Sequence, residues 1–205
     1  RAVELGLPPE RILVGPKELM NRLPADSELN LWAKKRVKYQ LVHGPMVGSV
    51  TDQSASVWLR TLGDAKVTVK CIETGSSVTA VTSKQADWTA VLKLEGLEPS
   101  KSYHYIVEVD EKVCSEASFK TFPASGMPGD FSVGFGGGAG YVPEWEGMWD
   151  TILKRKPDAF LMMGDNVYVD QPGQSLTQRY CYYRRQSRPE WRRFTSQTAI
   201  YSIWD

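Results

Sequence analysis

Between Leu41 and Pro123, apolar and polar side chains alternate at nearly every second position. A period of two is typical of strands with one buried and one exposed face. Five segments show it, at residues 57–60, 66–72, 89–94, 103–109 and 117–122. Turn-forming residues such as Gly63 and Gly75 separate these segments. Short strands at this spacing predict an all-β sandwich.

The most specific local signal lies between two of these strands. One apolar strand ends at Leu94, Leu97 and Pro99 form a corner, and Tyr103 begins the next strand. In a tyrosine corner the phenol bonds back to the preceding loop. We therefore predict this bond for Tyr103, and we predict that Trp58 is the buried tryptophan of the sandwich core.

Residues 41–123 resemble a fibronectin type III-like domain. Such sandwiches serve as spacers, binders and interface modules, so this resemblance alone predicts no single function. We interpret residues 1–40 as an N-terminal extension, with short helices expected near 16–23 and 27–37. Cys71 and Cys114 both fall in the sandwich, and two separate thiols are favoured over a disulfide between them.

Composition excludes several classes of function. The net charge of +1 predicts no nucleic-acid partner. The sequence contains no run of 18 or more apolar residues, so no membrane-spanning helix is expected. The three cysteines have no CxxC spacing, which argues against a structural zinc site. Both histidines, His43 and His104, lie in the sandwich, so a metal site further along must rely on oxygen donors. The chain begins at Arg1 without a signal-peptide pattern, so we expect a processed, trimmed or partial chain.

A turn-rich linker at 124–130 leads into a different pattern. Strands are predicted at 131–135, 159–163 and 199–204, with helices at 145–155 and 176–194. The order β-α-β-α-β predicts a parallel, right-handed α/β sheet. Three parallel strands with unpaired edges make a poor independent domain, so we expect residues 131–205 to begin a larger, truncated α/β domain.

The strand at 159–163 ends on oxygen donors. Gly164 and Asp165 follow it directly, and Tyr168 and Asp170 come next. This order places Asp165 at the carboxyl edge of the sheet, where open α/β folds build their sites. Three oxygen donors in six residues suit a hard or borderline cation such as iron, manganese or calcium. In the alternative interpretation Asp165 caps the next helix and Tyr168 packs sideways.

A second, weaker hypothesis concerns the glycines after the first strand of this region. Residues 134–139 match the G-x-G-x-x-A pattern of dinucleotide-binding folds. The acidic partner would be Asp165, which lies 26 residues beyond Ala139 rather than about 20. Gly134 also falls inside the strand instead of at its end, so we give this interpretation less weight.

Four motifs together resemble PhoD-type alkaline phosphatases. They are Leu41–Arg60, the tyrosine-corner segment, Met163–Asp170 and the arginine-rich run from Tyr182 that leads to Ile203-Trp-Asp205. Members of this family are metallophosphoesterases with a fibronectin-like domain followed by a calcineurin-like catalytic domain. The resemblance covers about residues 41–205 and implies metal-dependent hydrolysis of phosphate esters outside the cytoplasm.

The resemblance also implies roles for individual residues. Asp165 corresponds to the metal-bridging aspartate and Tyr168 to the iron ligand of an iron–calcium centre. Gly138 stands where the family has a cysteine ligand, which puts that centre in doubt. Asp170 is a weaker candidate, for a supporting or structural role near the metal. Asp205 is also a weaker candidate, because it corresponds to the first Asp of the family's Asp-Asp-His motif and lies just before the ligating position. The acid–base histidine is expected beyond Asp205, so we expect the chain alone to be inactive.

Six arginines fall between Arg179 and Arg193 on the helix expected at 176–194. With 3.6 residues per turn, Arg184, Arg188 and Arg192 would share one face. We consider Arg184 and Arg188 as ligands of a phosphate ester, against the simpler interpretation of a solvated basic face. A non-catalytic relative that binds a partner through the sandwich remains the alternative to an enzyme, and the sequence does not predict the oligomeric state.

Overall fold

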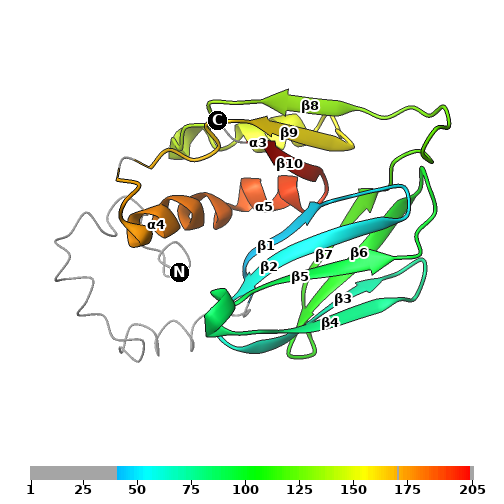
Figure 1. Ribbon diagram of the computed structural model, residues 1–205, viewed down its shortest axis with the longest axis horizontal. Helices are drawn as coiled ribbons and strands as arrows, with labels where there is room; N and C mark the ends of the chain where they lie inside the picture. Colours follow the sequence, from blue (N-terminus) through cyan, green and yellow to red (C-terminus); the bar gives the residue numbers. More distant parts are fainter. Residues whose placement is uncertain (1–40, 170, 204–205) are drawn as a thin grey trace.

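The computed structural model describes residues 41–169 and 171–203. It is mostly β, with two sheets and few helices (Figure 1). The strands are β1 (Leu41–Gly48), β2 (Ser54–Thr61), β3 (Ala65–Cys71), β4 (Ser77–Thr82), β5 (Thr89–Glu95), β6 (Ser102–Val109), β7 (Lys112–Lys120), β8 (Val133–Gly136), β9 (Ala159–Met163) and β10 (Ala199–Ile203). The helices are η2 (Lys84–Ala86), η3 (Pro143–Trp145), α3 (Met148–Leu153), α4 (Ser175–Gln186) and α5 (Pro189–Thr195). The helices expected before residue 41 lie outside the described residues, as do Asp170 and Asp205.

Strands β1 to β7 form the predicted sandwich. Antiparallel β5-β2-β1 packs against antiparallel β4-β3-β6-β7. Alternate side chains point inward, and buried Val67, Val69, Tyr105 and Val107 belong to one apolar core between the sheets. All five strands predicted from the alternation are present. The strands β1 and β4 were not predicted, because Gly44-Pro45 interrupts the alternation in β1 and β4 is half-exposed.

The tyrosine corner is confirmed, whereas the prediction for Trp58 is wrong. The Tyr103 ring is buried, and its phenol oxygen accepts a hydrogen bond of 2.7 Å from the Glu98 backbone N–H. In β2, Val57 and Leu59 occupy the inward positions, so the intervening Trp58 points to the other face of the sheet. There it is only partly buried and lines a shallow groove.

The second region contains the predicted parallel sheet, in the order β8-β9-β10. One face of this sheet packs against α3 and α5 through an aromatic cluster. The cluster consists of Trp149, Phe160, Met162, Trp191 and Phe194. The opposite face leaves Val133, Phe135, Met163 and Ile203 exposed. This region therefore has a smaller buried core than the sandwich.

The single helix predicted at 176–194 is in fact two helices. α4 ends at Gln186 and α5 begins at Pro189, with Arg188 in an extended conformation between them. Proline lacks a backbone N–H and disfavours a helical conformation in the residue before it, which explains the break. The sequence analysis expected Arg184, Arg188 and Arg192 on one helical face. Because the helix is broken, they do not share one.

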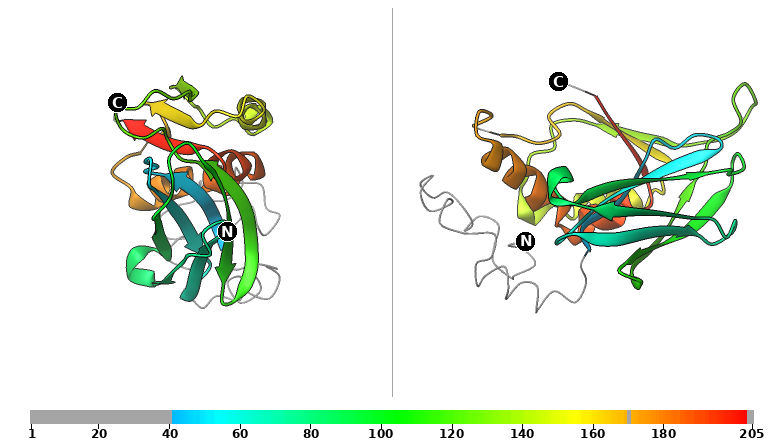
Figure 2. Two further views of the ribbon diagram at one scale, coloured as in Figure 1. Left: turned by 90° about the vertical axis from the view of Figure 1, so that its right-hand side faces the viewer. Right: turned by 60° about the horizontal axis from the view of Figure 1, so that its bottom comes forward.

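The two regions share one sheet. β10 pairs in parallel with β1 at Gly48 opposite Ile200, so the order across six strands is β5-β2-β1-β10-β9-β8. In the left view of Figure 2, β10 (red) lies between β9 (yellow) and β1 (blue). The expectation of two unpaired edges is thus wrong for β10, because the sandwich supplies its neighbour. A Cβ on Gly48 would come within 3.2 Å of the Ile200 carbonyl oxygen, so glycine permits this close approach.

Hydrogen bonds across this junction fix the two regions together. The Tyr105 phenol donates to the Ser196 carbonyl at 2.8 Å, and the Tyr201 phenol donates to the Val50 carbonyl at 2.8 Å. Arg192 Nε donates to the Gly44 carbonyl at 2.8 Å. Burial raises the pKa of both phenols, which keeps them protonated as donors.

Two expectations from composition are met within the described part of the chain. Cys71, Cys114 and Cys181 are all free thiols, as the favoured interpretation of the first two had it. No described helix is both long and apolar enough to cross a membrane.

Candidate functional site

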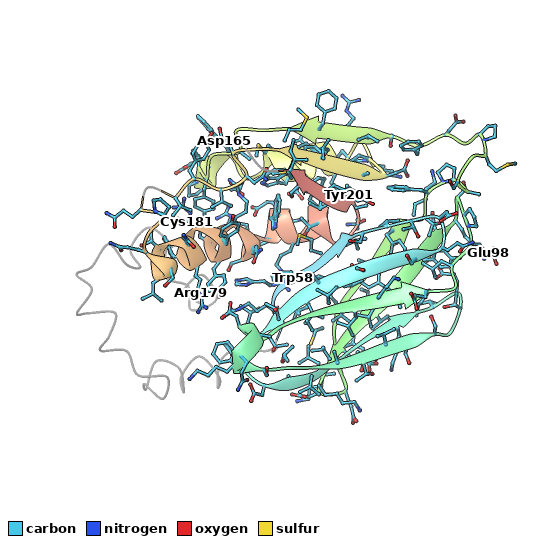
Figure 3. All side chains as sticks on the ribbon, viewed as in Figure 1. Trp58, Glu98, Asp165, Arg179, Cys181 and Tyr201 are labelled. Atoms are coloured by element: carbon cyan, nitrogen blue, oxygen red, sulfur yellow. The ribbon has the colours of Figure 1, made fainter. Side chains whose placement is uncertain are left out.

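The loop that follows β9 turns sharply at its first two residues. Gly164 has φ +92° and Asp165 has φ +48°, both in the left-handed region that favours glycine. Gly164 is buried, and the turn brings the Asp165 side chain to the surface. Figure 3 shows Asp165 past the carboxyl end of β9, on the side of α4 and far from Glu98 in the sandwich. The position of Asp165 at the carboxyl edge of the parallel sheet agrees with the sequence analysis.

Asp165 and Tyr168 contact each other directly. The Tyr168 phenol donates a hydrogen bond of 2.7 Å to Asp165 Oδ2. Tyr168 is 45% exposed and Asp165 is also exposed, so the pair lies at the surface. In α4 the N-cap position belongs to Gln174, so Asp165 does not cap the next helix as in the alternative interpretation.

The glycine loop after β8 lies against the same turn. The Gly138 N–H donates to the Gly164 carbonyl at 3.4 Å, and a Cβ on Gly137 would approach the Met163 carbonyl oxygen to 3.0 Å. A Cβ on Gly138 would lie 3.8 Å from the Tyr168 phenol oxygen. A side chain at position 138 would therefore reach the Asp165–Tyr168 pair, although φ +67° at Gly138 strains any residue other than glycine.

The structure does not support the dinucleotide interpretation of these glycines. Gly134 and Gly136 lie within β8, and α3 begins only at Met148, so no helix N-terminus follows the glycines directly. Gly134 has a packing role instead, because a Cβ there would lie 2.6 Å from the Phe160 ring.

A buried ion pair contacts the backbone of the loop after β9. Arg185 on α4 and Glu146 before α3 are separated by 3.1 Å, with side chains only 4% and 1% exposed. Arg185 Nη1 donates to the Asn166 carbonyl at 3.2 Å, immediately after Asp165. Trp149 Nε1 donates to the second Glu146 oxygen at 3.0 Å. Burial lowers the pKa of the Arg185 guanidinium, and the Glu146 carboxylate opposes that shift.

The two arginines considered for substrate binding have other contacts. The Arg184 guanidinium lies over the Tyr141 ring at 4.6 Å. Arg188 forms an ion pair of 3.3 Å with Glu190 and donates to the Pro143 carbonyl at 3.3 Å. A phosphate ester would have to compete with these contacts, so their assignment to substrate stays a prediction.

Sequence reasoning missed Arg185 and Glu146. Arg185 was counted within a basic run, and nothing in the local pattern separates it from its neighbours. Its partner lies 39 residues away, and single-sequence periodicity cannot detect a pair at that separation. One local signal pointed to Glu146. It lies three residues before Trp149, close enough for its carboxylate to accept a hydrogen bond from the indole N–H.

The described residues fit part of a metal centre. Asp165 and Tyr168 supply two adjacent oxygen donors, which suit iron or calcium. Within residues 41–169 and 171–203, no three His, Cys, Asp or Glu side chains come close enough to hold an ion together. Two donors are fewer than such a cation requires, so the described residues do not complete a centre by themselves.

Comparison with known proteins gives a likeness in fold. A solved structure of PhoD superimposes with a TM-score of 0.69 and 15% sequence identity, covering 82% of this chain and 40% of that one. At this identity the match shows a PhoD-like fold and no more. The chain thus spans well under half of the PhoD structure that it matches.

The remaining comparisons concern the sandwich. The sensor domain of the anti-sigma factor RsgI4 from Pseudobacteroides cellulosolvens matches with a TM-score of 0.33 and 15% identity, covering 42% of this chain and 98% of that one. The third fibronectin III domain of human KIAA0343 protein matches with a TM-score of 0.28 and 18% identity, covering 43% of this chain and 92% of that one. Neither score is high enough to carry an argument. No curated protein matches the sequence. A family model described as a domain of unknown function, DUF7800, matches residues 38–127, and the PhoD-like fold covers 82% of the chain and so extends beyond them.

Proposed function

We propose that the intact protein hydrolyses phosphate esters at a metal centre to which Asp165 and Tyr168 contribute ligands. The observation that carries the proposal is the hydrogen-bonded Tyr168–Asp165 pair at the carboxyl edge of a parallel sheet in a PhoD-like fold. In such centres bound iron and calcium supply an activated water and neutralise charge on the leaving oxygen.

The chain's own residues prepare this edge. The sharp turn at Gly164 and Asp165 presents the carboxylate, and Arg185 holds the following carbonyl in place. As a ligand Tyr168 acts as a phenolate, so the proton that it now donates to Asp165 has to leave. Metal binding is therefore expected to strengthen as pH rises. Asp170 and Asp205 remain proposed contributors, as do Arg184 and Arg188 for the ester.

Gly138 favours one competing function, a non-catalytic relative that acts through its sandwich. In place of the family's cysteine the loop offers no side chain, and the described residues provide only two donors. In this alternative the turn at Asp165 is retained for its structure alone.

Metal content of the full-length gene product tests the proposal. Elemental analysis is expected to find iron or calcium near stoichiometry, lost in Asp165→Ala and reduced in Tyr168→Phe. Asp130→Ala removes an exposed carboxylate elsewhere and should retain the metal. Loss of the metal in Asp165→Ala should also abolish hydrolysis of p-nitrophenyl phosphate esters. A wild-type protein that holds no metal would leave the non-catalytic alternative.

A second comparison probes position 138. Gly138→Cys would add a thiol beside Tyr168, whereas Gly138→Ala imposes the same backbone strain without a donor. If position 138 faces the centre, the cysteine variant should retain more iron than the alanine variant. Equal iron in both would show that position 138 lies away from the metal.

A further inference from the structure

A cavity with a largely basic lining lies at the junction of the two regions. Its volume is about 780 Å³, within the range of small-molecule sites. β6 and β7 form one wall, and α3, the loop before β9 and the residues around α5 form the other. The charged lining residues are Lys120, Asp150, Lys154, Lys156, Asp158 and Arg193.

The charges around this cavity do not balance. Four cations and two carboxylates line it, and each carboxylate already has a cationic partner. Arg193 binds Asp150 through two hydrogen bonds of 2.9 and 2.7 Å, and Lys120 lies 3.3 Å from Asp158. These pairs leave Lys154 and Lys156, both exposed, as two further positive charges on the same rim. An anion entering the cavity would meet them without displacing an internal carboxylate.

Residues with hydroxyl side chains also line the cavity. Ser102 at the start of β6 and Ser118 in β7 belong to the wall that these strands form. A hydroxyl can donate a hydrogen bond to an anion, so both suit an anionic ligand.

This cavity is separate from the candidate metal site. Asp158 and Thr198 directly precede β9 and β10, so the cavity lies at the amino edge of the parallel strands. Asp165 lies past the opposite end of β9. A strand of this length spans roughly 17 Å, too far for one small phosphate to reach both places.

We propose that this cavity is a second, non-catalytic site for a compact multivalent phosphate such as a di- or triphosphate group. The net positive lining selects for anions, and more than one negative charge is needed to engage both Lys154 and Lys156. The limited volume and the overall net charge of +1 favour a small anion over a nucleic acid. A lysine at the end of α3 also suits the helix dipole, which explains Lys154 alone but not the other cations.

Calorimetric titration of the full-length protein with inorganic tripolyphosphate tests this inference. Lys154→Ala/Lys156→Ala should weaken binding about tenfold, the loss expected for roughly one charged hydrogen bond. Lys84→Ala/Lys93→Ala removes the same charge from exposed lysines that do not line the cavity, and should bind as the wild type does. Binding should also weaken with added salt.

Asp165→Ala separates this site from the proposed catalytic one. Tripolyphosphate binding should persist in that variant, whatever its effect on metal or hydrolysis. Absence of binding in the wild type, an equal loss in both lysine pairs, or loss in Asp165→Ala would each overturn the inference.

Discussion

The sandwich and the α/β region are stabilised in different ways. Two antiparallel sheets enclose one continuous apolar core in the sandwich, filled by alternating side chains from every strand. The α/β region has a cluster of four aromatic side chains and Met162 on one sheet face and exposed apolar side chains on the other. Its interior also contains the Arg185–Glu146 ion pair, and buried ion pairs contribute less to stability than apolar packing does. The α/β region, which contains the candidate site, is therefore expected to be the less stable half of the molecule.

The largest expected effect comes from the aromatic cluster. Phe194 is fully buried, stacks on Trp149 and contacts Phe160 edge-on. Phe194→Ala should lower the free energy of unfolding by about 3–5 kcal/mol. Phe135→Ala, at a position 69% exposed, should have little effect. Hydrogen exchange should show faster opening of β9 and β10 than of β3 and β6, whereas uniform acceleration would mean that both regions open as one unit.

The buried ion pair offers a second way to test the contrast. Arg185→Met alone leaves Glu146 charged and buried, which should cost about 3 kcal/mol or more. Arg185→Met with Glu146→Leu should cost less than the single change, because no charge is left unpaired. Denaturant unfolding of both variants measures this difference. If the double variant is the less stable, the pair is a net source of stability and the two regions are more alike than proposed.

The tyrosine corner provides the matching test in the sandwich. Tyr103→Phe removes the acceptor of the Glu98 N–H while keeping the buried ring, and should cost roughly 1–2 kcal/mol. Tyr182→Phe, on the exposed side of α4, is the control and should be neutral. Exchange should accelerate around residues 97–103 and leave the loop after β9 unchanged. Faster exchange in that loop would show that the corner also supports the α/β region.

The smallest expected effect concerns the contact between α4 and the sandwich. Burial, and then the hydrogen bond donated to Asp87, raises the pKa of Tyr183 from 10 to about 12. A raised pKa favours the protonated phenol in the folded state, so this stability is present below pH 10 and is lost as pH rises toward 12. Tyr183→Phe should therefore lose less stability than the wild type across that window, by about 1 kcal/mol. Parallel pH dependences would show that the contact contributes nothing.

The sequence predicted those features that depend on neighbouring residues. Alternation located five sandwich strands, and the spacing from Leu97 to Tyr103 predicted a corner bond. The Asp165–Tyr168 contact follows from a strand that ends in a tight turn, and the sequence placed both at that edge. Trp58 was assigned to the core from its residue type, although Val57 and Leu59 on either side occupy the inward positions.

Features that depend on distant residues were not predictable. Nothing near Arg185 indicates that Glu146 is its partner, and nothing near β10 indicates that β1 is its neighbour. The basic cavity likewise combines residues from β6, β7, α3 and α5. The break before Pro189 differs from these cases. The single helix expected at 176–194 was wrong, although the effect of proline on the preceding residue is a local signal that indicates the break.

The pairing of β1 with β10 has a consequence for the order of folding. The two strands are about 150 residues apart in the chain, and closing so long a loop is slow compared with forming the sandwich. During synthesis the sandwich can therefore assemble first and present β1 as a ready edge for the parallel strands. Cutting the chain within residues 124–130 would leave β10 with an open edge, and such edges promote aggregation. Expressed alone, residues 131–205 are expected to aggregate, and adding the separately folded sandwich during refolding should reduce it.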